Sequence, residues 1–189
     1  FQPRLAMGKL QPPWEPEAQR AQRNRRSLYA MKMRNLGHPL MEVFNRPNTE
    51  LSCETRDQTT VVTQAFTLFH SEFSYARALA LADRVVRETG SADVGAMFRI
   101  VLGRVPTAEE KQVTAAHLTE MLAHHRAHPP EETELPREVK MTNVVEKTGE
   151  QKITTFKLKT LANYERDLQP WQVSAETRAL AEIALVLFN

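Results

Sequence analysis

Four histidines in one short segment make the strongest metal-binding signal in this sequence. His117, His124 and His128 are separated by seven and four residues, so a helix would place their imidazoles on one face. The segment has no HExxH pattern, and the dipole at a helix C-terminus also favours imidazolium there. We therefore keep two interpretations, a metal site formed by these three residues and a solvated, charge-tuned helix end, with the second as the default.

The candidate nucleophile is Cys53, the single cysteine of the chain. A cation lowers the pKa of a neighbouring thiol, and Arg56 lies close in sequence. No histidine partner is identifiable, and a free cysteine also packs as a small apolar residue, so we interpret Cys53 as structural and assign no catalytic residue. One cysteine excludes an internal disulfide, a four-cysteine zinc site and a CxxCH haem attachment. The sequence also has no P-loop and no GxGxxG motif, and no cofactor is expected in this chain.

A polar motif extends from Arg25 to Gln64. Neighbouring residues of an extended segment point to opposite sides, so one guanidinium of the Arg25-Arg26 pair can reach solvent or an anion while the other pairs internally. Gln64 could bond the loop around Cys53 back to the domain. A brace is favoured over a ligand site, and both stay open. The motif residues without an assigned role are Arg25, Arg26, Tyr29, Cys53, Arg56, Thr59 and Gln64.

The elements that position these residues are mostly helices. Apolar residues recur at helical spacing over residues 61–69 and 75–86, and Gly90 supplies a stop. Thr59 or Thr60 is the predicted cap of the first of these helices. Ser91 is the predicted cap of a third helix with one apolar stripe, which ends at Gly103.

Two further helices carry clear start signals. Thr107 followed by Glu110 is a capping box, and it predicts a helix that reaches about His128. Ser174 is the predicted cap of a final helix. Because that helix is apolar nearly all round, it should lie at the centre of the domain.

The signals for secondary structure are weaker in the rest of the chain. Prolines over residues 1–16 prevent regular structure and indicate an extended arm. We expect a helical turn over 17–24, a short strand over 27–33, a helix over 39–44 and a long polar loop over 45–60.

Residues 136–147 allow two interpretations. An early proline and a late Gly149 favour a helix, whereas β-branched residues weaken it and favour a hairpin that turns near Thr148 and Gly149. Residues 152–158 alternate like a short strand.

The predicted fold is therefore mainly α, an irregular helical domain with an extended N-terminal strap and a small β element. Residues 1–24 form the strap and residues 25–189 a single helical domain. The longest apolar run, 179–188, is shorter than the ~20 residues of a membrane span, so none is expected. The sequence ends inside this predicted apolar helix, and we expect the chain to be a fragment of a larger protein.

Charge is unevenly distributed around the net value of +2. Residues 1–34 are strongly basic, and the remainder is net acidic. Nucleic-acid proteins usually add stacking aromatics, a glycine loop or a reading helix to such an arm, and none is evident, so no nucleic acid is expected. Docking on the chain's own acidic body, solvation and binding of an anionic glycan remain as roles for the arm.

Short motifs are spread over the chain from about residue 10 to its end. They are Arg25-Arg26-Ser27-Leu28-Tyr29, Ser52-Cys53 with Arg56, Thr59-Thr60, Gln64-Ala65, Leu102-Gly103-Arg104 with Pro106-Thr107 and Glu110, Asp167-Leu168-Gln169-Pro170-Trp171, Thr177-Arg178-Ala179-Leu180-Ala181 and Leu187-Phe188-Asn189. In these motifs the chain resembles the C-terminal half of a planctomycete-type domain of unknown function. That domain stands at the C-terminus of large secreted proteins whose N-terminal parts often carry c-type cytochrome modules.

The resemblance implies an extracytoplasmic location, periplasmic or secreted, and a multidomain parent with haem c, if present, bound elsewhere. It supplies no catalytic residue. We expect a non-catalytic structural or interaction module whose partners are other domains or subunits, including cytochrome c-type ones. The alternative is an accessory part of a redox or polysaccharide-degrading enzyme complex, with a site near Arg25, Cys53, Arg56 and Gln64. A second alternative is anionic glycan binding.

Overall fold

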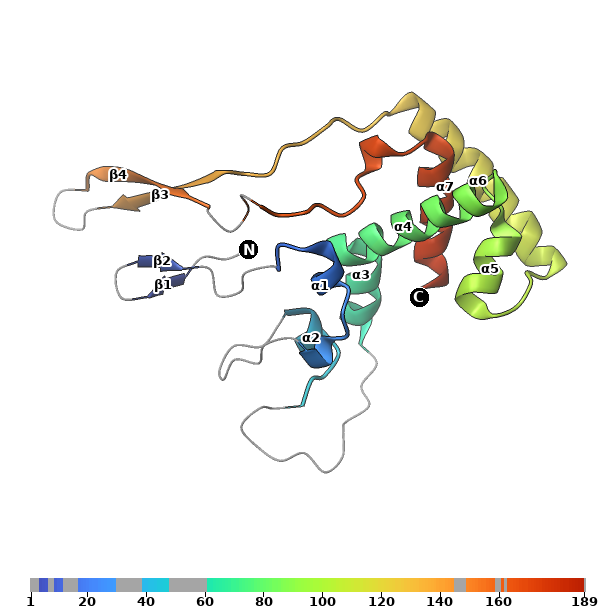
Figure 1. The fold of residues 1–189 in the computed structure, drawn as a ribbon, viewed down its shortest axis with the longest axis horizontal. Helices are drawn as coiled ribbons and strands as arrows, with labels where there is room; N and C mark the ends of the chain where they lie inside the picture. Colours follow the sequence, from blue (N-terminus) through green and yellow to red (C-terminus); the bar gives the residue numbers. More distant parts are fainter. Residues whose placement is uncertain are drawn as a thin grey trace. The chain divides into compact units, whose positions relative to one another are not determined.

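A computed structural model of the chain describes residues 4–6, 9–11, 17–29, 39–47, 61–144, 149–158, 161 and 163–188 (Figure 1). The chain divides into two compact units. One comprises residues 1–36 with 133–166, and the other comprises residues 37–132 with 167–189. The fold is mainly α with a small β element, as the sequence predicted.

The second unit is a helical assembly built around its C-terminal helix. Its helices are α2 (Pro39–Val43), α3 (Val62–His70), α4 (Glu72–Thr89), α5 (Val94–Leu102), α6 (Ala108–Ala127) and α7 (Ala175–Leu187). The helix α7, red in Figure 1, contacts α3, α4, α5 and α6. Leu180, Ile183 and Ala184 of this helix are buried. The prediction of a central final helix is therefore confirmed.

Short side chains line the contact between α4 and α7 in the core. Ala78 and Ala82 are buried in α4, and Ala181 and Ala184 are buried in α7. Because an alanine adds little bulk, the two backbones can approach closely while larger side chains such as Met97 fill the space beside them. The core therefore rests on α4, α5 and α7.

Local signals set most helix ends in this unit. Gly90 and Gly103 adopt left-handed conformations at φ 75° and 69° and end α4 and α5. Thr107 and Glu110 form both hydrogen bonds of the predicted capping box of α6. The predicted Ser91 cap is wrong, because Asp93 holds the N-cap position of α5 and accepts from the backbone N–H of Ala96.

The first unit contains α1 (Arg20–Arg23), a 3₁₀-helical turn (Ser27–Tyr29) and two hairpins. The predicted helix over 136–147 is wrong, and the alternative is correct. Strands β3 (Glu138–Val144) and β4 (Gln151–Lys157) pair antiparallel, with Thr142 opposite Ile153. Cross-strand pairing of β-branched residues stabilises this arrangement better than a helix would.

Two N-terminal predictions also need correction. Strands β1 (Arg4–Ala6) and β2 (Lys9–Gln11) pair antiparallel, so the first residues are not wholly irregular. Both lie between prolines and thus escape the restriction that proline imposes. The predicted strand over 27–33 is wrong at Ser27–Tyr29, where the backbone turns and the Tyr29 N–H donates to the Arg26 carbonyl. Its remainder, and residues 48–60 of the predicted loop, lie outside the described residues.

Of the helices that the structure describes, none combines the length and apolar character needed to cross a membrane.

Candidate functional site

The histidines of α6 lie in two different environments. The rings of His124 and His128 are 4.6 Å apart between centroids, and the Nδ1 of His128 lies 3.1 Å from the carbonyl oxygen of His124. His125 turns inward, with its Nε2 3.6 Å from a carboxylate oxygen of Glu182 in α7. Within the described part of the chain, no group of three or more histidine, cysteine or acidic side chains is placed to hold a metal ion.

His125 and Glu182 belong to a half-buried polar cluster between α4, α6 and α7. Burial lowers the pKa of His125, and the charges of Arg178 and His124 add to this effect. Burial raises the pKa of Glu182, although His117 and His124 oppose it. Burial also raises the pKa of Tyr75 in α4, and the Glu182 carboxylate adds to this. Burial therefore disfavours the charged forms of these three side chains, which lie on three different helices.

The charge of Arg178 in α7 acts on both His125 and Tyr75, and the role of this residue was not predicted from the sequence. It is 7% exposed and donates to the carbonyls of Pro170, Val173 and His125 at 3.0, 2.7 and 3.2 Å. The available signal was its type, because it is the one cation in α7, a helix that is mostly apolar. A buried guanidinium normally has several acceptors.

The described members of the polar motif belong to different units. Arg25 and Tyr29 lie in the first unit, where the guanidinium carbon of Arg25 is 4.7 Å from the ring centroid of Tyr29. The same guanidinium donates to the Gln22 side-chain oxygen at 3.0 Å. The side chain of Arg26 is exposed. These arginines therefore present positive charge beside an exposed aromatic ring.

Gln64 lies in the second unit and ties two of its helices together. Its side-chain nitrogen donates to the Val43 carbonyl of α2 at 3.1 Å. The N-cap position of α3 is Val61, so this helix has no hydroxyl cap there. The prediction that Thr59 or Thr60 caps this helix is therefore wrong. The predicted motif members Cys53, Arg56 and Thr59 lie outside the described residues.

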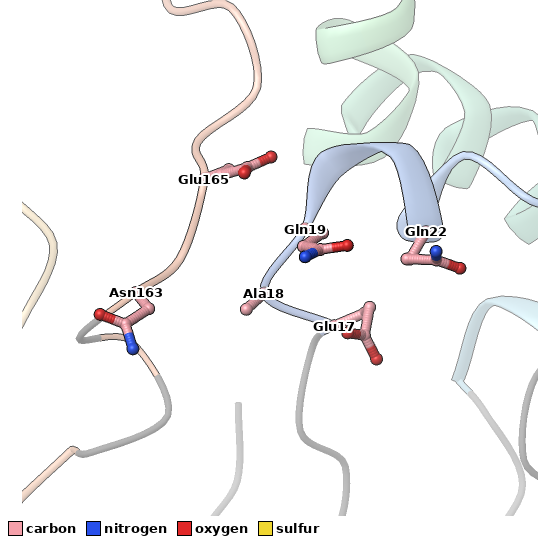
Figure 2. A pocket seen from close by; sticks show the side chains of 6 residues that line it. All are labelled: Glu17, Ala18, Gln19, Gln22, Asn163 and Glu165. Carbon is pink, nitrogen blue, oxygen red and sulfur yellow. The ribbon is translucent and has the colours of Figure 1, made fainter.

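An open hollow of about 610 Å³ lies in the first unit (Figure 2). Its lining is Glu17, Ala18, Gln19, Gln22, Asn163 and Glu165. A carboxylate oxygen of Glu165 accepts from the Arg20 backbone N–H at 3.0 Å, and the Gln22 amide oxygen accepts from Arg25. Because polar side chains form its walls and two of them are engaged within the unit, the hollow offers little apolar contact to a ligand.

An exposed apolar surface of the second unit lies along α3, with Val61 at its N-cap and Phe73 in the first turn of α4. We call it the apolar face and define it as Val61, Val62, Phe66, Phe69 and Phe73, all of which are exposed. Val62, Phe66 and Phe73 are 73%, 59% and 57% exposed. Val62, Phe66 and Phe69 are spaced by four and three residues, so they form one stripe along the helix.

The opposite side of α3 packs on its own unit and is more polar. Gln64, Thr67 and Leu68 are its half-buried residues, and Gln64 bonds to α2 as described above. The helix is therefore inverted, since an ordinary surface helix turns its apolar stripe toward the core and its polar residues toward water.

Neighbouring side chains hold two rings of the apolar face. The ring of Phe66 stacks on the imidazole of His70, with centroids 6.0 Å apart and planes at 18°. The guanidinium of Arg77 lies 5.9 Å from the Phe73 ring centroid and is itself held by Asp167, at 2.6 Å. Because these contacts reduce ring motion, covering the face costs less side-chain entropy.

Comparison with known proteins identifies a family for this chain. The family model described as PSD1, a protein of unknown function (DUF1553), matches residues 2–118 of the 189-residue chain. That range contains the polar motif and the apolar face. No curated protein and no solved structure matches the chain. Because the match covers more than half of its sequence, the chain belongs to the PSD1 family of proteins of unknown function.

Proposed function

We propose that this chain is a non-catalytic interaction module and that the apolar face of α3 is its docking surface. The observation that carries the proposal is the inversion of α3. Phe66 and Phe69 point away from the unit that Gln64 faces. Folding of the isolated unit gains nothing from that orientation, whereas a partner that covers the phenylalanines does gain from it.

The free energy gained by covering the exposed phenylalanines is large enough for a docking surface. A phenylalanine presents about 150 to 250 Å² of surface, so the exposed parts of Phe66, Phe69 and Phe73 offer on the order of 300 Å². At ~25 cal/mol per Å², covering that area contributes roughly 7 kcal/mol before the costs of association. This is a substantial part of the free energy of a stable complex.

The setting of the module is also part of the proposal. The sequence resemblance supports an extracytoplasmic location in a large multidomain protein or complex, with c-type cytochrome modules among the partners. Any haem would then be held by another domain or subunit, and this chain would position it through protein contacts.

Site-specific photo-crosslinking tests the docking surface. A benzophenone amino acid replaces Phe66 in the whole chain, and the matched control carries it at Val113, which is 62% exposed on α6. We expect a discrete cross-linked species from position 66 that disappears when Phe69→Asp is added. No cross-link at position 66 above that at position 113 would contradict the proposed function.

A second candidate is supported by the first unit. Arg25 lies over the ring of Tyr29, which is 66% exposed, and Arg26 is exposed beside it. An aromatic ring with adjacent guanidinium groups can stack on a sugar and pair with its sulfate or carboxylate.

Binding to heparin, measured at increasing salt, tests this candidate. Arg25→Ala should weaken binding and reduce its salt dependence, because one fewer cation contacts the polymer. Arg84→Ala removes the same charge from the exposed surface of α4 and serves as the control. Equal affinities of the two variants would refute anionic glycan binding at Arg25.

A further inference from the structure

We infer that the apolar face binds the apolar face of a second copy of this chain, in an antiparallel pair around a two-fold axis. This inference rests on the proposed function, because it names the partner of the same surface. It is supported by the charge, the area and the residue spacing of α3.

The charge of α3 favours an uncharged partner. Its nine residues, Val62–His70, include no aspartate, glutamate, lysine or arginine. A charged partner would therefore find no opposite charge to pair with on this helix, and its own charges would lose hydration. A second copy brings an equally uncharged surface, so neither copy buries a formal charge from α3. Contact between the two α3 helices therefore brings no like formal charges together, and the Arg77 guanidinium beside Phe73 is paired with Asp167.

The area of the face meets the minimum for a specific dimer. With Val61 and Val62 added to the phenylalanines, the exposed apolar area is on the order of 500 Å² per copy. Two copies would together bury roughly 1,000 Å², which is about the lower limit of specific protein interfaces. A weak dimer is therefore expected, one that dissociates on dilution.

The spacing of the stripe favours the antiparallel orientation. Phe66 lies near the middle of α3, so a two-fold axis through that point brings it against Phe66 of the second copy. Val62 then faces Phe69 of the second copy, which pairs a smaller side chain with a larger one. The helix dipoles oppose each other, and the two His70 side chains lie at opposite ends of the interface. A parallel pair would place both histidines together.

Sedimentation velocity of the whole chain over a range of concentrations tests the inference. We expect a species of twice the 21.6 kDa chain mass at high concentration, which dissociates on dilution. Phe66→Asp should weaken this dimer at least about tenfold, since it buries a charge opposite its own copy. Val113→Asp, on an exposed valine outside the face, should dimerise like the parent chain. Circular dichroism checks that both variants fold.

A cysteine at the two-fold axis locates the contact. In a Cys53→Ser background, Phe66→Cys should form an intermolecular disulfide on mild oxidation, whereas Val113→Cys should not. A chain that is monomeric at every concentration, or a dimer that survives Phe66→Asp, overturns the inference. If photo-crosslinking at position 66 then captures a different protein, the inference that the partner is a second copy is wrong, while the proposed function stands. Failure of both experiments overturns both proposals.

Discussion

The guanidinium of Arg178 in α7 donates a 3.2 Å hydrogen bond to the backbone carbonyl of His125, in the last turn of α6. The carbonyls of a last helical turn have no partner within the helix, so a buried donor from another helix supplies one. The positive charge also lies at the negative end of the α6 dipole. Since Arg178 bonds Pro170 and Val173 as well, one side chain joins α6, α7 and the segment before α7.

The first prediction concerns this bond. Arg178→Met should lower the free energy of unfolding by about 2 to 4 kcal/mol, because three partly buried carbonyls lose their donor. Urea denaturation at neutral pH measures the effect. The control is Arg84→Met, which removes an exposed ion pair with Glu88 and should cost well under ~1 kcal/mol. Equal losses for the two variants would show that Arg178 does not hold these segments together.

The second prediction concerns His125 and pH. Burial lowers its pKa below the usual 6.5, so the unfolded chain binds a proton more readily than the folded chain does. The resulting stability is present above pH 6.5 and is lost as the pH falls through the lowered pKa. His125→Gln should therefore make the decline in unfolding free energy on acidification shallower. Denaturation curves at several pH values measure this, and an unchanged slope would contradict it.

The third prediction concerns Glu182, whose effect on the pH dependence of the unfolding free energy is opposite to that of His125. Burial raises its pKa above 4.5, so its contribution to stability is present below pH 4.5 and is lost as the pH rises through the raised pKa. Glu182→Gln removes a carboxylate that is costly to ionise when buried. Its stability relative to the parent chain should therefore be higher at pH 7 than near pH 4. The same relative stability at both pH values would mean that Glu182 is well solvated.

The fourth prediction concerns Glu110 at the start of α6. Bonds from Arg104 at 2.7 Å, and from the Thr107 backbone N–H at 2.7 Å, lower the pKa of Glu110 to about 2. The stabilisation by this carboxylate is present above pH 4.5 and is lost as the pH falls through about 2. Titration of its carboxyl carbon by NMR should give a midpoint near 2.

Two variants test the cause of that midpoint. Arg104→Ala should raise it toward 4.5, because the largest contribution to the lowered pKa is removed. Arg99→Ala removes a neighbouring cation that pairs with Asp93 and should leave the midpoint of Glu110 in place. If the midpoint of Glu110 is unchanged in Arg104→Ala, the hydrogen bonds between the Arg104 and Glu110 side chains do not persist in solution.

The fifth prediction concerns the end of α5. Gly103 has φ 69°, and a Cβ at this position would meet nothing within 4 Å. Gly103→Ala should therefore lower the free energy of unfolding by about 1 to 2 kcal/mol, through backbone strain alone. Gly103→Asn should cost less, because asparagine tolerates the left-handed conformation. Thermal denaturation of the two variants measures the difference, and equal costs would point to a contact instead of strain.

Some features of the fold were predictable because they depend on neighbours in sequence. The bonds of Thr107 and Glu110 join residues three positions apart, and Gly103 ends its helix through its own φ, so no distant contact is needed. The same holds for Ser174, which caps α7 by accepting from the Thr177 N–H. The apolar character of α7 was likewise sufficient to place it at the centre.

Other features depend on residues far apart in sequence. Residues 138–144 become a strand because 151–157 pair with them, and a local pattern alone also allowed a helix. The role of Arg178 depends on acceptors up to 53 positions away. No local sequence pattern predicts such distant acceptors.

The helix α3 shows most clearly which features the local sequence determines and which depend on tertiary structure. The spacing of its apolar residues determined that it is a helix, since an amphipathic stripe arises from the 3.6-residue repeat of the backbone. The same stripe is compatible with either orientation of the helix. Only tertiary structure decided that Gln64 faces α2 and that Phe66 faces outward, because the packing of α2, α4 and α7 left the inner side to the more polar residues.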